Sequence, residues 1–193
     1  LMNYGATFAL GYLLSIYLQM VMGFDSQIAG LILISQPLVM AILSPYAGRL
    51  SDRVSPFKLA SFGMGLCALG LFSFIFISEN YPFPLIIVNF IVVGVGFAFF
   101  SSPNTNAVMA CVEKKDYSVA SSILATMRSI GHSMSMAIVT FIISRQMGTA
   151  TLNDAEPGQI VDTMHIAFIV FTIICAVGIF ISLKRKQQGT KQG

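Results

Sequence analysis

The chain has 193 residues, of which 55% are hydrophobic and only 10% are charged, and its formal net charge is +3. Soluble domains carry roughly 25% charged residues, and the mean hydropathy here is +0.80. A soluble domain of this length could not keep so much apolar surface from water, so that class is excluded. The modest positive charge does not favour binding to nucleic acid.

Six apolar stretches follow one another along the chain, and each is long enough to cross a bilayer. A bilayer core about 30 Å thick requires roughly 20 apolar residues in a helix. The predicted spans are residues 4–22, 28–48, 58–78, 84–111, 118–144 and 164–183. The sequence therefore predicts an all-α integral membrane protein, with a six-helix domain over residues 1–186 and a disordered tail over residues 187–193.

The first two predicted spans contain few polar side chains. Ser15, Tyr17 and Gln19 lie in the first span, and Gln36 lies in the second. Such side chains in a membrane more often satisfy a neighbouring helix than bind a substrate. Tyr17 and Gln36 are nevertheless candidate substrate-binding residues.

A short polar joint separates the second and third spans. It reads Gly48-Arg49-Leu50-Ser51-Asp52-Arg53-Val54-Ser55-Pro56-Phe57-Lys58. Gly48 permits close approach of a helix backbone. Asp52 can pair with Arg49 or Arg53, or face the positive N-terminus of a neighbouring helix. The alternative is a basic loop that only directs topology.

Small residues recur at every fourth position in the fourth and fifth spans. They are Gly94, Ala98, Ser102 and Asn106 in the fourth, and Ser121, Ala125, Ser129, Ser133 and Ala137 in the fifth. Such stripes let helix backbones approach closely, so packing is their expected role. Three prolines inside spans each remove a backbone donor and predict bends, at Pro37, Pro45 and Pro103.

Arg128 is the one charged residue deep inside a predicted span. A charge at the bilayer centre costs at least about 2.5–3.5 kcal/mol on insertion scales, so the guanidinium needs a cavity or a partner. His132 lies one turn further along the same face. Arg128, His132 and Asn89 of the fourth span are candidate substrate-binding residues. The alternative is that Arg128 bonds helix carbonyls and fixes packing.

No other residue pattern indicates catalysis or metal binding. Cys67, Cys111 and Cys175 lack metal-ligand spacing and are expected to act as small apolar residues. His132 and Ser133 face different directions on a helix, and no buried acid orients them. Neither HExxH nor CxxC nor a phosphate-binding glycine loop is present. The sequence therefore predicts no enzyme, no metal and no cofactor.

The basic residues predict an orientation in the membrane. Nine of the 11 lysines and arginines lie in the second and fourth joints or after the sixth span. The opposite joints hold one, Arg145, with the acidic residues Asp25, Glu79, Asp154, Glu156 and Asp162. The positive-inside rule makes the first side cytoplasmic, with both termini, in a multi-pass protein of the cell membrane. The third external joint, Arg145 to Asp162, is expected to be irregular.

Two stretches resemble a known family of carriers. The joint at Gly48, Leu50, Asp52, Arg53 and Lys58 resembles the G-x-L-x-D-R-x-G-R-R/K motif of the major facilitator superfamily, with Ser55 in place of the second glycine. Pro103-Asn104 and the run from Ala120 to Gly131 resemble the EmrB/QacA-type drug:proton antiporters, although His132 stands where a small residue is usual.

The resemblance implies one half of a carrier made of two helical halves. Because the chain begins inside an apolar run, it is expected to be the C-terminal half, with an N-terminal half of six or eight helices as its partner. The conformational latch would consist of Gly48, Arg49, Asp52 and Arg53. The expected function is alternating-access efflux of drugs or other amphipathic small molecules, driven by the proton gradient. The proton-binding acid would lie in the other half, because no span holds a carboxylate. A carrier for one metabolite and a self-standing six-helix assembly protein are the alternatives.

Overall fold

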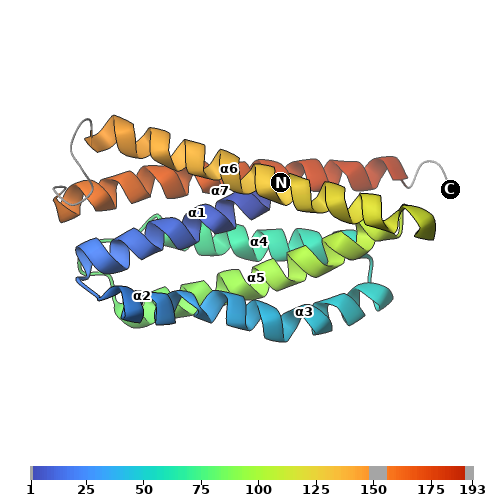
Figure 1. Cartoon of the computed structure of the whole chain (residues 1–193), viewed down its shortest axis with the longest axis horizontal. Coiled ribbons are helices and arrows are strands. Elements are labelled where there is room, and N and C mark those ends of the chain that lie inside the picture. Colours follow the sequence, from blue (N-terminus) through green and yellow to red (C-terminus); the bar gives the residue numbers. More distant parts are fainter. Residues whose placement is uncertain (1, 148–155, 190–193) are drawn as a thin grey trace.

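Every element of the described chain is a helix. The computed structural model describes residues 2–147 and 156–189, with side chains for residues 2–146 and 156–180. In chain order the elements are α1 (Met2–Ile16), the π-helix η1 (Tyr17–Val21), α2 (Ser26–Leu33), α3 (Ser35–Arg53), α4 (Pro56–Phe74), α5 (Phe83–Met109), the 3₁₀-helix η2 (Lys114–Asp116), α6 (Tyr117–Met147) and α7 (Pro157–Gly189). Figure 1 shows the long helices side by side, with the joints at the two ends of the bundle.

Five helical segments are long and apolar enough to cross a membrane. They are Met2–Val21, Ser26–Arg53, Pro56–Phe74, Phe83–Met109 and Pro157–Phe180. By length and composition they support a membrane protein, and they correspond to five of the six predicted spans. The remaining span corresponds to α6, which at 31 residues is about 46 Å long but contains several serines, two arginines and a histidine. Its passage through the membrane stays a prediction.

The second span is interrupted near its middle. α2 ends at Leu33, Ile34 forms a turn, and α3 begins at Ser35. Pro37 explains the position of this break. It offers no N–H to the carbonyl of Leu33, and its ring would clash with that carbonyl. At Pro45 and Pro103, by contrast, α3 and α5 continue as α-helix.

The prediction that the stripe on the fourth span packs against a neighbour is confirmed. A Cβ atom added to Gly94 of α5 would lie 2.9 Å from the backbone oxygen of Gln36 in α3, so these helices need a glycine there. Further along, Asn106 Nδ2 donates to Ser51 Oγ at 2.7 Å. The stripe on α6 is different, because all five of its residues are exposed.

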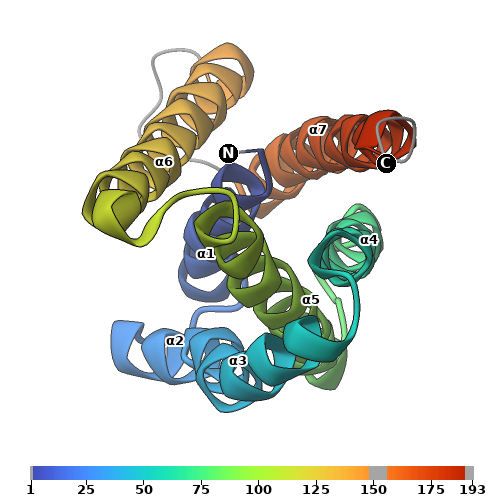
Figure 2. The same cartoon turned by 90° about the vertical axis from the view of Figure 1, so that its right-hand side faces the viewer.

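The core lies among α1, η1, α4, α5 and α7. Phe74 of α4 stacks on Phe168 of α7, with ring centroids 5.6 Å apart, and meets the edge of Phe90 of α5. Viewed from one end, α1 lies near the middle, with α6 and α7 to one side and α2 and α5 to the other (Figure 2). This position makes α1 the helix against which both α6 and α7 pack.

Three helix ends differ from their predicted positions. α6 continues through Met147 and α7 begins at Pro157, so helix occupies both ends of the joint expected to be irregular; residues 148–155 lie outside the described chain. α7 also runs through Gly189, which makes the first three residues of the predicted disordered tail helical. The rest of that tail is not among the described residues.

Candidate functional site

The charged residue of α6 rests on an aromatic ring of α1. The Cζ atom of Arg128 lies 4.9 Å from the centroid of the Tyr4 ring. Tyr4 is only 6% exposed. Its hydroxyl shares a hydrogen bond of 3.2 Å with Ser101 of α5, and it makes edge contacts with Phe97 and Phe100 at 5.4 Å. The ring is therefore a fixed platform, and a cation over such a ring is stabilised electrostatically.

The donor edge of Arg128 is free. The side chain is exposed, and its guanidinium forms no hydrogen bond or ion pair within the described chain, where the one ion pair joins Lys115 to Glu113. The bonds to helix carbonyls that the alternative hypothesis requires are absent from this part of the chain. A guanidinium that stacks through its face keeps its planar fork of N–H donors available for an anion.

A second ring contact lies one turn further along both helices. The imidazole of His132 stacks on Phe8, with centroids 4.6 Å apart and planes inclined by 15°. His132 is half-buried, whereas Phe8 is 42% exposed. Since Tyr4 and Phe8 are four residues apart, as are Arg128 and His132, the two contacts form successive rungs between parallel helices. We call these four residues the α1–α6 ladder.

Two glycines let α1 and α6 come this close. A Cβ atom added to Gly5 would lie 2.7 Å from the backbone oxygen of Gly131. Beside this contact, an apolar cavity of about 160 Å³ lies between α1, α6 and α7. Its lining residues are Met2, Gly5, Gly131, Met134, Ser135, Ile138, Phe171 and Ile174.

The other candidate substrate-binding residues lie apart from the ladder. Tyr17 is fully buried, and its hydroxyl donates to the backbone oxygen of Ser78 at 2.7 Å, so it is closed to a ligand in this conformation. Gln36 and Asn89 are half-buried, at the crossings of α3 with α5 and of α4 with α5. Neither amide forms a hydrogen bond with described residues. Their role in binding stays a prediction.

The predicted latch residues lie at the end of α3. A Cβ atom at Gly48 would approach Ser102 Oγ to 3.0 Å, so this glycine allows close contact with α5. Ser51 Oγ donates to the Gly48 carbonyl at 2.6 Å. Arg49, Asp52 and Arg53 are exposed, and within the part of the chain that the structure describes none of the three forms an ion pair. Asp52 therefore remains available to a partner.

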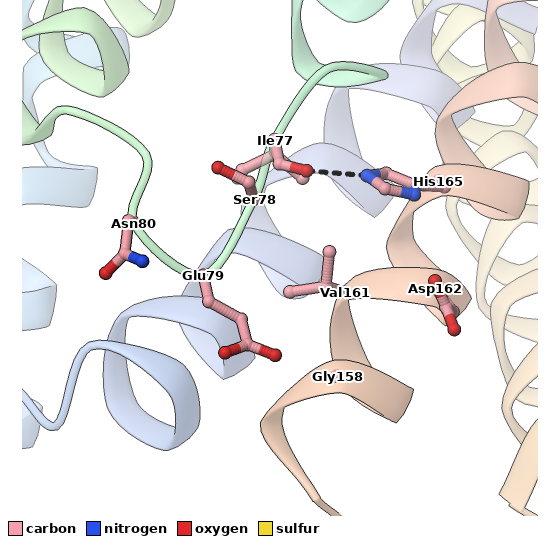
Figure 3. Close-up of a pocket in the computed structure, with 8 residues that line it drawn as sticks. All are labelled: Ile77, Ser78, Glu79, Asn80, Gly158, Val161, Asp162 and His165. Carbon is pink, nitrogen blue, oxygen red and sulfur yellow. Dashed lines mark hydrogen bonds between the residues drawn. The ribbon is translucent and has the colours of Figure 1, made fainter.

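A polar cavity of about 360 Å³ lies at the opposite end of the bundle (Figure 3). One nitrogen of the His165 ring in α7 bonds the backbone oxygen of Ile77, in the joint after α4. The next carbonyl, that of Ser78, accepts the Tyr17 hydroxyl. Glu79 and Asp162 line the same cavity, and both are exposed. The histidine and the tyrosine thus hold one joint from two different spans.

The buried cysteines belong to the packing, as expected. Cys67 of α4 and Cys175 of α7 are fully buried free thiols. Asn3 of α1 lies between them, donating to Cys67 Sγ at 3.9 Å and accepting from Cys175 Sγ at 3.7 Å. No group of three or more histidine, cysteine or acidic side chains suited to a metal occurs among the described residues.

The aromatic partners of Arg128 and His132 were not predicted from the sequence. The available signal was the spacing of Tyr4, Phe8 and Tyr12, which recur every four residues and so share one face of α1. A matching interval separates Arg128 from His132. Nothing in the sequence, however, shows that these two faces meet.

Comparison with known proteins gives the family. A protein-family model with the description Major Facilitator Superfamily matches residues 1–192. The uncharacterized transporter YebQ of Escherichia coli (strain K12) is 30% identical over 174 residues, which cover 90% of this chain and 36% of that protein. The riboflavin transporter RibZ of Clostridioides difficile (strain 630) is 22% identical over 175 residues, or 91% of this chain and 38% of RibZ. The multidrug resistance protein Stp of Mycobacterium tuberculosis (strain ATCC 25618 / H37Rv) is 29% identical over 136 residues, or 70% and 25%.

The chain thus spans 25–38% of the length of these relatives. The family match extends over nearly all of it, and five of its helical segments are suited to a membrane. The chain belongs to the major facilitator superfamily of membrane transporters.

Proposed function

We propose that this chain is the C-terminal half of a proton-coupled exporter of amphipathic small molecules, which works by alternating access. The observation that carries the proposal is the α1–α6 ladder. It holds a cation within a long apolar bundle, stabilises it on a ring, and leaves its donors unoccupied. An ionisable residue inside a membrane generally serves transport, because its placement is costly.

The remaining parts of the carrier would come from outside this chain. The share of the relatives that the chain covers supports a partner half of six or eight helices. No carboxylate occurs within the predicted spans, so the acid that binds the coupling proton would belong to that half. The faces of α1 and α6 that carry the ladder would then line the path of a small-molecule substrate between the two halves.

The orientation follows from the charges at the two ends. Arg49, Arg53 and Lys58 lie at the end of the bundle that also holds Lys114 and Lys115. The joint after α4 and the start of α7 lie at the opposite end (Figure 1), where Glu79 and Asp162 line the cavity described above. The basic end would face the cytoplasm, together with both termini, in the cell membrane. The exposed Asp52 would close a cytoplasmic latch against the partner half.

A carrier for one metabolite is the second candidate. Its support is the resemblance to the riboflavin transporter RibZ, whereas the name of Stp supports drug efflux. Both functions need the same alternating access and differ in how many substrates the site accepts. The breadth of the substrate range therefore distinguishes them.

Transport by the full-length carrier in proteoliposomes tests this function. We expect several amphipathic dyes to accumulate when a pH gradient is imposed and to stop doing so when nigericin collapses it. Movement of riboflavin alone would favour the metabolite carrier. Dye movement that ignores the gradient would contradict proton coupling, and the absence of saturable movement of any compound would contradict transport through this site.

A further inference from the structure

We propose that the α1–α6 ladder selects planar aromatic substrates that carry a negative charge, and that Arg128 and Phe8 are its specificity-determining residues. The proposal rests on the transport function above and specifies the chemical class of its substrate. Two features of the ladder carry it: a cation held over a ring with free donors, and an exposed aromatic surface one turn away.

The first feature recognises the charge. Tyr4 is held by its hydroxyl bond to Ser101 and by two neighbouring rings, so the Arg128 guanidinium, with its Cζ atom 4.9 Å from the ring centroid, rests on a fixed ring. The side chain of Arg128 is exposed, and its forked N–H donors form no hydrogen bond within the described chain. A planar fork of this kind matches a carboxylate or sulfonate with two parallel hydrogen bonds.

The second feature recognises a flat ring. Phe8 and His132 already form a stacked pair, and Phe8 is 42% exposed, so part of its side chain is left uncovered by the described residues. The rungs are four residues apart, or about 6 Å along the helix. An aromatic acid is large enough to place its charged group at Arg128 and its ring against Phe8. Offset or edge contact between aromatic rings adds to the burial of apolar area.

The charge balance of this half disfavours cationic substrates. Apart from residues at helix ends, the described spans contain a cation and no carboxylate. The polar side chains from the end of α1 to the start of α2 are neutral: Gln19 of η1 bonds Ser15, and Ser26 of α2 bonds Gln19. Because charges interact strongly in a medium of low dielectric constant, a cationic drug near Arg128 would be repelled and an anion attracted.

Two dyes with the same fused ring system and opposite charge provide the test. Fluorescein is an anion at neutral pH and rhodamine 123 is a cation. Binding to the purified full-length carrier is measured by fluorescence anisotropy, and uptake is measured in proteoliposomes. We expect wild-type protein to prefer fluorescein. Arg128→Ala should weaken fluorescein binding by about tenfold or more, since a charge-assisted hydrogen bond is lost, without weakening the binding of rhodamine 123.

Matched variants separate the two features. Arg145 is the other arginine of α6 and also lies over a ring, that of Phe141 at 5.8 Å, so Arg145→Ala is the control for loss of an arginine. Arg128→Lys keeps the charge but not the fork, and should recover only part of the affinity. Phe8→Leu should weaken fluorescein binding by about threefold to tenfold while leaving the binding of cholate, a non-planar anion, unchanged.

The outcomes distinguish this inference from the function on which it rests. A wild-type carrier that moves rhodamine 123 in preference to fluorescein would keep the transport function and overturn the substrate class. So would an unchanged preference in Arg128→Ala, which would mean that the guanidinium instead pairs with an acid of the partner half. A wild-type carrier that moves none of the probes would contradict both.

Discussion

At the scale of single residues, the ladder explains how a cation is tolerated in a span. Arg128 has no acidic partner in the described chain, and the quadrupole of the Tyr4 ring takes that place. The same contact leaves the donors of the guanidinium free, which an ion pair or bonds to carbonyls would not do. Stabilisation and availability therefore come from one arrangement, so packing and substrate binding are not exclusive roles for this residue.

A double-mutant cycle tests the contact between Tyr4 and Arg128. Tyr4→Leu and Arg128→Gln should each lower the stability of the full-length carrier. The double variant should lose less stability than the sum of the two single losses. The expected coupling is about 0.5–1 kcal/mol, as for exposed cation–aromatic pairs. Denaturant unfolding in detergent measures it. The pair Tyr4→Leu and Arg145→Gln, which are not in contact, should show no coupling, and equal coupling in the two cycles would contradict the assignment.

Asp52 provides a second prediction at this scale. It is exposed and without an ion pair in the described chain, so Asp52→Asn should leave expression and melting temperature unchanged. If Asp52 contacts the partner half in one conformation only, the same variant should reduce the transport rate. Flux per folded molecule measures this, with Asp116→Asn, another exposed acid at the same end, as the control. A wild-type transport rate in Asp52→Asn would contradict the assignment of Asp52 to a latch.

At the scale of elements, close helix crossings determine which faces meet. Gly94 lets α5 approach α3, and Gly5 lets α1 approach Gly131 of α6 closely enough for the ladder to form. Where a crossing is this tight, adding a single methyl group at the glycine forces one of the helices to move. The position of the ladder rungs thus depends on glycines that touch no substrate.

A pair of alanine substitutions on one helix tests this dependence. Gly5→Ala should destabilise the carrier by about 1–3 kcal/mol, because its Cβ atom would overpack the crossing. Gly11→Ala is the matched control, since a Cβ atom there meets nothing within 4 Å. Thermal unfolding should rank Gly5→Ala well below both the wild type and Gly11→Ala. Equal melting temperatures for the two variants would contradict the tight crossing of α1 and α6.

The elements themselves were more predictable than their contacts. Runs without charged residues identify membrane helices because each helix must avoid burying charges in lipid, and this constraint can be read from consecutive residues. The stripe through Gly94 and Asn106 in turn predicted a packing face. The break at Ile34 followed from Pro37, but whether a proline interrupts or only bends a helix depends on its neighbours. The burial of Tyr17 and the pairing of Phe8 with His132 were beyond prediction. Both depend on which helices become neighbours, and their partners lie far away in the sequence.

At the scale of the whole molecule, the bundle has a basic end and an acidic end. This asymmetry predicts that the basic end faces the cytoplasm. Ser55→Cys and Asn80→Cys would place exposed thiols at the two ends, in a Cys111→Ser background that removes the exposed native thiol. In intact cells an impermeant maleimide should label Asn80→Cys and not Ser55→Cys. If Asn80→Cys were labelled only after the cells are permeabilised, the orientation would be the opposite of the predicted one.

The central claim is that the face formed by α1 and α6 lines the path of the substrate. The most direct measurement compares Arg128→Ala with Arg145→Ala in the reconstituted full-length carrier, as flux per folded molecule driven by a pH gradient. Both variants remove an arginine of α6 that rests on a ring. We predict that Arg128→Ala abolishes or redirects transport while Arg145→Ala transports as the wild type does. Normal flux in Arg128→Ala, with the same range of substrates, would contradict the account.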